Sequence, residues 1–189
     1  MSAPLLLDPA LYWTLRASLS ALLLSAAAHK LRDLRAFDAA VAAYELVPRR
    51  GGPAIARLIV ASELGVTVGL WLTSAAAPAL IAAMLLTTYT AAIAINLVRG
   101  RRDIDCGCAG PAGRMPIGPE LLVRNLILIA ASLASALPVV SRQIRWLDTL
   151  TIVGGTAVLA MLYAAANTAV AYGTGPHWRP VGAEAGDRP

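Results

Sequence analysis

Five apolar runs separated by polar connections most constrain what this chain can fold into. They cover residues 11–28, 54–73, 79–98, 121–137 and 150–172. A helix needs about 20 such residues to cross a bilayer, so each run predicts a transmembrane helix. Hydrophobic residues make up 58% of the chain and charged residues 14%, whereas a soluble domain carries about 25% charged residues. The sequence therefore predicts an all-α integral membrane protein, a bundle of four to five transmembrane helices.

The segment between the first two runs has a different character. Within residues 30–47, apolar side chains recur at steps of three or four, which places them on one helical face; they are Leu31, Leu34, Phe37, Val41 and Tyr44. Six charged residues lie among them, too many for a transmembrane helix. The pattern predicts an amphipathic helix in the membrane interface or over the mouth of the bundle. It is as typical of a connector helix as of a functional lid.

The sharpest chemical feature is a polar loop over residues 99–119, between the third and fourth runs. It contains both cysteines of the chain, Cys106 and Cys108, which are separated by one glycine. A disulfide in so small a ring is strained and therefore easier to reduce than a structural disulfide. It also removes little entropy from the unfolded chain. The spacing thus favours thiol–disulfide exchange over a structural role.

Other interpretations of the two cysteines stay open. The first is that they are inert loop thiols, and the second is that they belong to a docking loop for a partner. The third is that they bind a soft metal such as Cu(I), with His29 or His177 as a further ligand. Two cysteines alone fall short of a zinc site. Arginines around the loop favour the thiolate, whereas Asp103 and Asp105 oppose it. The local charges therefore do not decide between these interpretations.

Some polar residues lie inside the apolar runs. Glu63 stands about two turns into the second run, and an intramembrane carboxylate is costly and by default functional. The alternative, which we favour, is a packing role in which Glu63 pairs with Arg57 or with a polar group of a neighbouring helix. Arg16 is near one end of the first run, where its long side chain can reach the interface. Arg124 and Asn125 lie one turn into the fourth run.

The net charge of +5 comes mainly from basic residues in the connections between the apolar runs. This placement indicates anionic lipid headgroups and membrane orientation rather than nucleic acid. With five spans, thirteen Lys and Arg residues lie on the side of the cysteine loop and three on the other side. The positive-inside rule then places the cysteines in the cytoplasm, where a thiol pair stays reduced.

Two stretches of the sequence resemble a known membrane-protein family. The first is His29-Lys-Leu-Arg-Asp with Phe37, Tyr44 and Pro48. The second combines Asn96-Leu-Val-Arg-Gly-Arg, Asp105-Cys-Gly-Cys-Ala-Gly and Leu122-Val-Arg-Asn. Over residues 11–137 the chain is similar to the methylamine utilisation protein family MauE, and more distantly to DoxX-type membrane proteins. Many MauE relatives have phenylalanine where Ala109 stands.

This resemblance implies a bacterial inner-membrane protein needed for the maturation of methylamine dehydrogenase. The small subunit of that enzyme is periplasmic and rich in disulfides. The implied partners are this subunit and the thioredoxin-like protein MauD, with Cys106 and Cys108 as the exchanging pair. Supporting positions that match the family are Glu63, Arg124, Asn125, His29 and Lys30. The implied role requires a periplasmic cysteine loop, opposite to the side that the charge count indicates.

A thiol pair at the mouth of a small helical bundle is also similar to the quinone-linked disulfide generators of the vitamin K epoxide reductase family. That similarity adds a quinone as a candidate cofactor. Here the pair is Cys-Gly-Cys rather than Cys-x-x-Cys, and the chain has no second pair to relay electrons. The other functional hypotheses are a non-enzymatic membrane chaperone or docking platform and a metal-handling protein. We expect one membrane domain over residues 1–172 and a flexible tail over residues 173–189.

Overall fold

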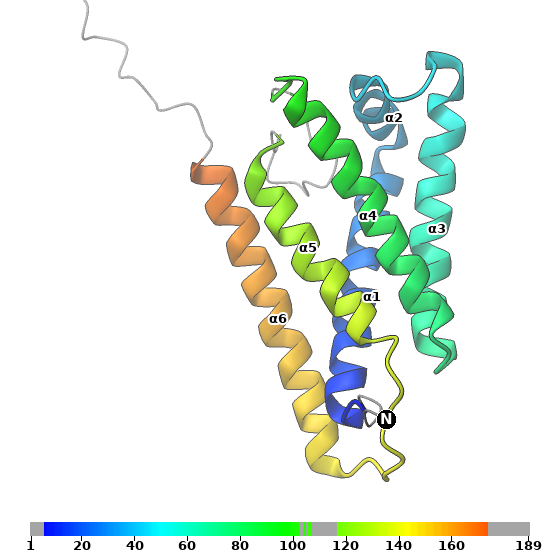
Figure 1. Ribbon diagram of the computed structural model, residues 1–189, viewed down its shortest axis with the longest axis vertical. Helices are drawn as coiled ribbons and strands as arrows, with labels where there is room; N and C mark the ends of the chain where they lie inside the picture. Colours follow the sequence, from blue (N-terminus) through cyan, green and yellow to red (C-terminus); the bar gives the residue numbers. More distant parts are fainter. Residues whose placement is uncertain (1–5, 103, 105, 107–116, 174–189) are drawn as a thin grey trace, which may run out of the picture.

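The computed structural model describes residues 6–102, 104, 106 and 117–173, and this part of the chain folds into six α-helices. They are α1 (Pro9–Arg32), α2 (Leu34–Ala43), α3 (Gly52–Leu72), α4 (Ala77–Val98), α5 (Pro119–Ala134) and α6 (Trp146–Gly173), with a short 3₁₀ helix, η1 (Arg49–Gly51), before α3. All but α2 run along the long axis of the molecule, in alternating directions (Figure 1). The predicted all-α membrane bundle is confirmed.

Four of the helices, α1, α3, α4 and α6, are long and apolar enough to cross a membrane. Helix α5 has 16 residues and therefore rises about 24 Å, less than the ~30 Å thickness of the hydrocarbon core. The apolar run predicted over residues 121–137 continues past the end of α5 as turns, in which the amide of Leu137 donates to the carbonyl of Ala134 at 3.1 Å. A run of apolar residues therefore overestimates the length of this helix.

The boundary between the first transmembrane helix and the amphipathic helix differs from the prediction. Helix α1 extends to Arg32, so His29 and Lys30 form its last turn instead of opening the amphipathic segment. The chain breaks at Asp33, where φ is −143° and ψ is 79°. The Asp33 carboxylate accepts a hydrogen bond from the amide of Ala36 at 2.9 Å and so caps α2. The amphipathic helix is correspondingly shorter than residues 30–47.

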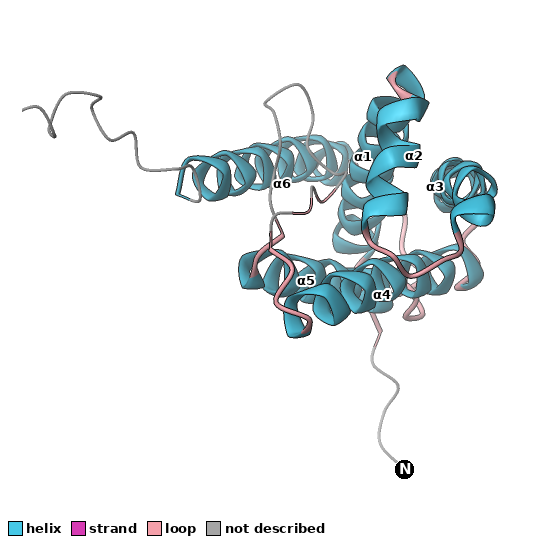
Figure 2. Ribbon diagram, turned by 90° about the horizontal axis from the view of Figure 1, so that it is seen from above, coloured by secondary structure: helices cyan, strands magenta, loops and turns pink. Residues whose placement is uncertain are grey.

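The bundle has two ends with different contents. The thiol end, as we call it, is the end where α2, the last turn of α4 and the first turn of α5 lie (Figure 1). The first turn of α1, the turn between α3 and α4, and the connection from α5 to α6 lie at the opposite end. Viewed from above, α1 lies between α6 and α3 (Figure 2), and it packs against both. Helix α4 packs against α5 and α3.

The centre of the bundle is apolar and closely packed. Leu19 and Leu23 of α1 form one cluster with side chains of α3 and α4. Gly155 of α6 faces α1, since a Cβ atom built there would lie 3.0 Å from the Thr14 methyl carbon. A small residue at this position lets the two helices approach closely, as is common where helices pack in a bilayer.

Arg16 does not reach out to the interface as the sequence suggested. Only 1% of this residue is exposed. Its guanidinium donates hydrogen bonds to the carbonyl oxygens of Leu70 at 2.9 Å, Thr73 at 2.6 Å and Ala75 at 3.3 Å. The last carbonyls of a helix lack partners within the helix. Arg16 of α1 supplies hydrogen-bond donors to the carbonyls at the end of α3. A charged residue that was expected at the periphery therefore stabilises the turn between α3 and α4.

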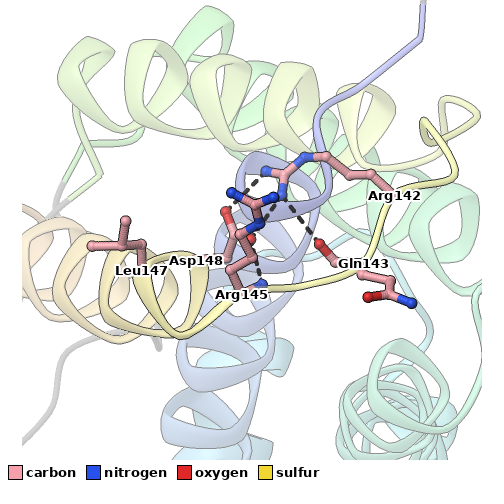
Figure 3. A pocket seen from close by; sticks show the side chains of 5 residues that line it. All are labelled: Arg142, Gln143, Arg145, Leu147 and Asp148. Carbon is pink, nitrogen blue, oxygen red and sulfur yellow. Dashed lines mark hydrogen bonds and ion pairs between the residues drawn. The ribbon is translucent and has the colours of Figure 1, made fainter.

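A second arginine stabilises the same end of the bundle, opposite the thiol end. Arg142, in the connection to α6, forms ion pairs with Asp8 at 2.9 Å and with Asp148 at 2.7 Å. The hydrogen bond from the Ala10 amide, and then that from Arg142, hold the pKa of the Asp8 carboxyl below its usual value of 3.8. Arg142 and Asp148 also line an open cavity of about 340 Å³ with Gln143, Arg145 and Leu147 (Figure 3). This network ties the start of α1 to the start of α6.

Candidate functional site at the thiol end

Cys106 lies at the thiol end in an apolar cluster. It is 8% exposed and packs with Ile93 of α4, Ile104, Ile117 and Leu121 of α5. The amide of Ile117 donates to the carbonyl of Ile104 at 3.0 Å, which joins the two sides of the cysteine loop. The sulfur is therefore held at the mouth of the bundle, between α4 and α5. Cys108 lies outside the described residues, so its pairing with Cys106 stays a prediction.

The C-terminal end of α2 covers this cluster. Ala43, the last residue of α2, and the next residue, Tyr44, pack against the apolar side chains around Cys106. Leu97 of α4 and Leu122 of α5 complete the packing. The amphipathic helix that was predicted over the mouth of the bundle thus lies at the same end as the thiol.

Asn96 connects α2 to the start of the cysteine loop. This residue of α4 is completely buried, and its amide nitrogen donates to the Tyr44 carbonyl at 3.2 Å and to the Ala92 carbonyl at 3.1 Å. Its side-chain oxygen accepts a hydrogen bond from Arg101 at 3.4 Å. Arg101 also forms an ion pair with Glu45 at 3.0 Å. Asn96 thus bonds both to its own helix and to the end of α2.

Glu63 forms a buried ion pair with Lys30 of α1, not with Arg57. The side chains of Lys30 and Glu63 are 4% and 1% exposed. Arg57 is exposed; it precedes Glu63 by six residues, a spacing that places it on another face of α3. The hydroxyl of Tyr89 on α4 donates to Glu63 Oε1 at 2.8 Å. The predicted packing role of Glu63 therefore has its partners on α1 and α4.

Lys30 also contacts two aromatic rings. Its ammonium nitrogen lies 5.0 Å from the ring centroid of Phe37 on α2 and 5.0 Å from that of Tyr89, distances typical of cation–π attraction. The second carboxylate oxygen of Glu63, Oε2, has no hydrogen-bond partner among the described residues. This junction joins α1, α2, α3 and α4. Along α4, Tyr89 lies one turn from Ile93, which packs in the Cys106 cluster.

Arg124 and Asn125 lie on α5, and the Arg124 side chain reaches α6. The guanidinium of Arg124 donates to the side-chain oxygen of Asn167 at 3.0 Å and to that of Asn125 at 3.3 Å. It also lies 5.6 Å from the ring centroid of Tyr163. Asn125 is 3% exposed. These contacts join α5 to α6, an arrangement that the sequence did not reveal because it says nothing of which helices are neighbours.

The remaining candidate ligands are separated. His29 is partly exposed in the last turn of α1, and His177 lies outside the described residues. Within residues 6–102, 104, 106 and 117–173, no three His, Cys, Asp or Glu side chains are grouped as metal ligands. The soft-metal interpretation gains no ligand set from this part of the chain.

The charge difference between the two ends persists in three dimensions. Lys30 is buried against Glu63 and Arg101 is paired with Glu45. The exposed arginines at the thiol end are Arg32, Arg35, Arg50, Arg57, Arg99 and Arg102. At the opposite end Arg142 is balanced by two carboxylates. By the positive-inside rule this distribution favours a cytoplasmic thiol end.

Comparison with known proteins identifies the family. Residues 8–138 match the family model described as methylamine utilisation protein MauE. The methylamine utilization protein MauE of Paracoccus denitrificans is 39% identical over 135 residues, which cover 71% of this chain and 73% of the relative. That of Paracoccus versutus is 37% identical over 162 residues, 85% of this chain and 87% of the relative. No solved structure matches the chain significantly. The matched region contains α1 to α5 and both cysteines, and the chain belongs to the methylamine utilisation protein MauE family.

Proposed function

We propose that this protein acts in methylamine utilisation by exchanging a disulfide through Cys106 and Cys108 during the maturation of methylamine dehydrogenase. The observation that carries the proposal is the position of Cys106. Its sulfur is at the mouth of the bundle, and the two sides of its loop are joined by the bond between Ile117 and Ile104. A thiol at this position can meet a partner from the aqueous side while the loop stays anchored to the membrane domain.

The exchange is a balanced two-electron reaction. A thiolate of a substrate protein attacks the disulfide of Cys106 and Cys108, and the S–S bond breaks as a mixed disulfide forms. The second substrate thiolate resolves that bond, so the substrate gains a disulfide and the pair becomes a dithiol. The disulfide of a thioredoxin-like partner reoxidises the pair by the same two steps. The substrate is the disulfide-rich small subunit, and exchange between these pairs needs no quinone.

The proposal requires a periplasmic thiol end, because disulfides persist there and are rare in the cytoplasm. The exposed arginines at this end argue for the opposite orientation. The two arguments predict different sides of the membrane for the same two thiols. The side of the membrane that the two thiols face therefore decides between exchange and its alternatives.

Single-thiol variants test the exchange through its covalent intermediate. Removing the resolving thiol leaves the attacking one to accumulate as a mixed disulfide. We expect either Cys106→Ser or Cys108→Ser to yield a reducible adduct with a thioredoxin-fold protein, identified by mass spectrometry after acid trapping and separation without reductant. The double serine variant is the matched control and should form none. Absence of an adduct from both single variants, with wild-type amounts of protein in the membrane, contradicts the exchange.

A docking platform is the second candidate function, and the burial of Cys106 favours it. At 8% exposure, Cys106 meets a protein partner only after the side chains around it move, whereas a platform needs no such movement. A platform predicts that both serine variants keep full methylamine dehydrogenase activity. It also predicts that polar substitutions along the apolar face from Leu31 to Tyr44 lose that activity. Thiol–disulfide exchange predicts instead that both serine variants lose methylamine dehydrogenase activity.

A further inference from the structure

Asn96 uses every hydrogen-bonding group of its side chain on a different segment. One bond returns to its own helix at Ala92, one reaches the Tyr44 carbonyl at the end of α2, and one comes from Arg101 at the entry to the cysteine loop. The amide of Arg101 also donates to the carbonyl of Asn96 at 3.0 Å. Both donors and the acceptor of this buried amide therefore have partners, without which burying it would be costly.

The end of α2 depends on these polar contacts. Helix α2 has 10 residues and none of them is buried, so apolar burial contributes less to its placement than it does for α1, α3, α4 and α5. Beyond its last turn, Glu45 has a φ of 50°, a backbone conformation that non-glycine residues adopt only when neighbouring contacts hold it. Those contacts come from Asn96, through the Tyr44 carbonyl, and from Arg101, through the Glu45 carboxylate.

The same contacts hold the described side chains of α2 and α4 that pack on the Cys106 cluster. Tyr44 packs on the apolar cluster around the sulfur, and Leu97, which follows Asn96, packs there too. Arg101 precedes Cys106 by five residues, so its position determines where the chain enters the loop. The Asn96 side chain therefore joins two walls of the Cys106 environment, the end of α2 and the start of the loop.

We propose that Asn96 is a positioning residue for Cys106, which closes the end of α2 over the sulfur and opens when its bonds to Tyr44 and Arg101 are released. The proposal rests on the proposed function in that Cys106 is the exchanging thiol. The pair of Arg101 and Glu45 is partly exposed, with side-chain exposures of 31% and 69%, so it is a weak contact that a docking partner can replace. The buried Asn96 amide holds the closed arrangement.

Alkylation of Cys106 measures this closure directly and needs no partner. We would use full-length protein in detergent with Cys108→Ser, so that one thiol reports, and measure the maleimide reaction rate under reducing conditions across a range of pH. Asn96→Leu is expected to raise the rate about tenfold, the factor that corresponds to one lost buried hydrogen bond. Opening should multiply the rate equally at every pH, and Asn96→Gln should restore part of the protection. An unchanged rate, or a rise that only follows loss of helix content by circular dichroism, overturns the proposal.

The surface pair gives a second test, in which Glu45→Gln leaves every hydrogen bond of the Asn96 side chain in place and Arg101→Gln also removes the bond from Arg101. Arg101→Gln and Glu45→Gln are each expected to raise the alkylation rate by about twofold to fivefold, the factor for an exposed ion pair. The exchanged pair, Arg101→Glu with Glu45→Arg, should return the rate toward wild type, and Arg99→Gln is the matched control without effect. Equal rates in all of these variants overturn the role of the pair.

The outcomes also separate this proposal from the proposed function. Faster alkylation of the Asn96 variant without any trapped partner in cells leaves the closure standing and contradicts the exchange. A trapped partner combined with unchanged alkylation contradicts the closure alone.

Discussion

Replacing Glu63 with alanine is expected to destabilise the protein by about 3–5 kcal/mol, because it leaves the Lys30 ammonium buried without its counter-ion. The side chain of Lys30 is 4% exposed, so water cannot take the place of the carboxylate. Tyr89 also loses the acceptor of its hydroxyl. We would measure this as a lower melting temperature in detergent and as a loss of protein from the membrane fraction.

Removing both charges is the matched control. In Lys30→Met with Glu63→Leu, no charge is left unpaired, and replacing a buried ion pair by apolar residues of similar volume is often neutral or stabilising. We expect this double variant to melt close to wild type. A Glu63→Ala variant as stable as wild type would show that Lys30 finds other solvation. A double variant as unstable as the single one would show that the packing of α1, α3 and α4 requires the pair itself.

The second large effect is expected at the cysteines. Cys106→Ser or Cys108→Ser should reduce active methylamine dehydrogenase to background, since one thiol cannot complete an exchange that needs two. The readouts are dehydrogenase activity, the amount of the small subunit, and growth on methylamine. The variant protein itself should remain in the membrane, because replacing a sulfur by an oxygen leaves the apolar runs that cross the bilayer unchanged.

Two controls make this result specific. Ala109→Phe changes the same loop but keeps both thiols, and it is expected to retain full activity. Cys106→Ala avoids placing a hydroxyl among apolar side chains, so it separates loss of the thiol from an effect on packing. Full dehydrogenase activity in both serine variants would reject exchange and favour the docking platform.

The fold class followed from the sequence because each apolar run is long enough to satisfy its own backbone as a helix in lipid. The position of the C-terminal end of α1 could not be predicted from the sequence. Lys30 looks like the start of a polar segment, yet it lies in the last turn of a transmembrane helix. Its charge is tolerated there by Glu63, which lies 33 residues away in the sequence. Periodicity within one helix cannot reveal a partner on another.

The same limit applies to the candidate site. The spacing of Cys106 and Cys108 singled out the loop, and α2 was expected over the bundle mouth. Tyr44 packs on the Cys106 cluster, and Asn96 binds its carbonyl oxygen there. Both contacts depend on how α2 and α4 meet in space. The burial of Arg16 could not be predicted for a related reason, since the carbonyls that bind it belong to the end of α3. Contacts between helices had to come from the structure.

The most direct test of the exchange is the side and the redox state of the two thiols in living cells. We would treat intact cells with a membrane-impermeant maleimide before and after reduction, and lysed cells as the reference for complete labelling. The proposed function predicts labelling of Cys106 and Cys108 in intact cells only after reduction, which means a periplasmic disulfide. Labelling that appears only after lysis would place the thiols in the cytoplasm, as the exposed arginines at this end favour. That result would contradict direct disulfide exchange with a periplasmic subunit.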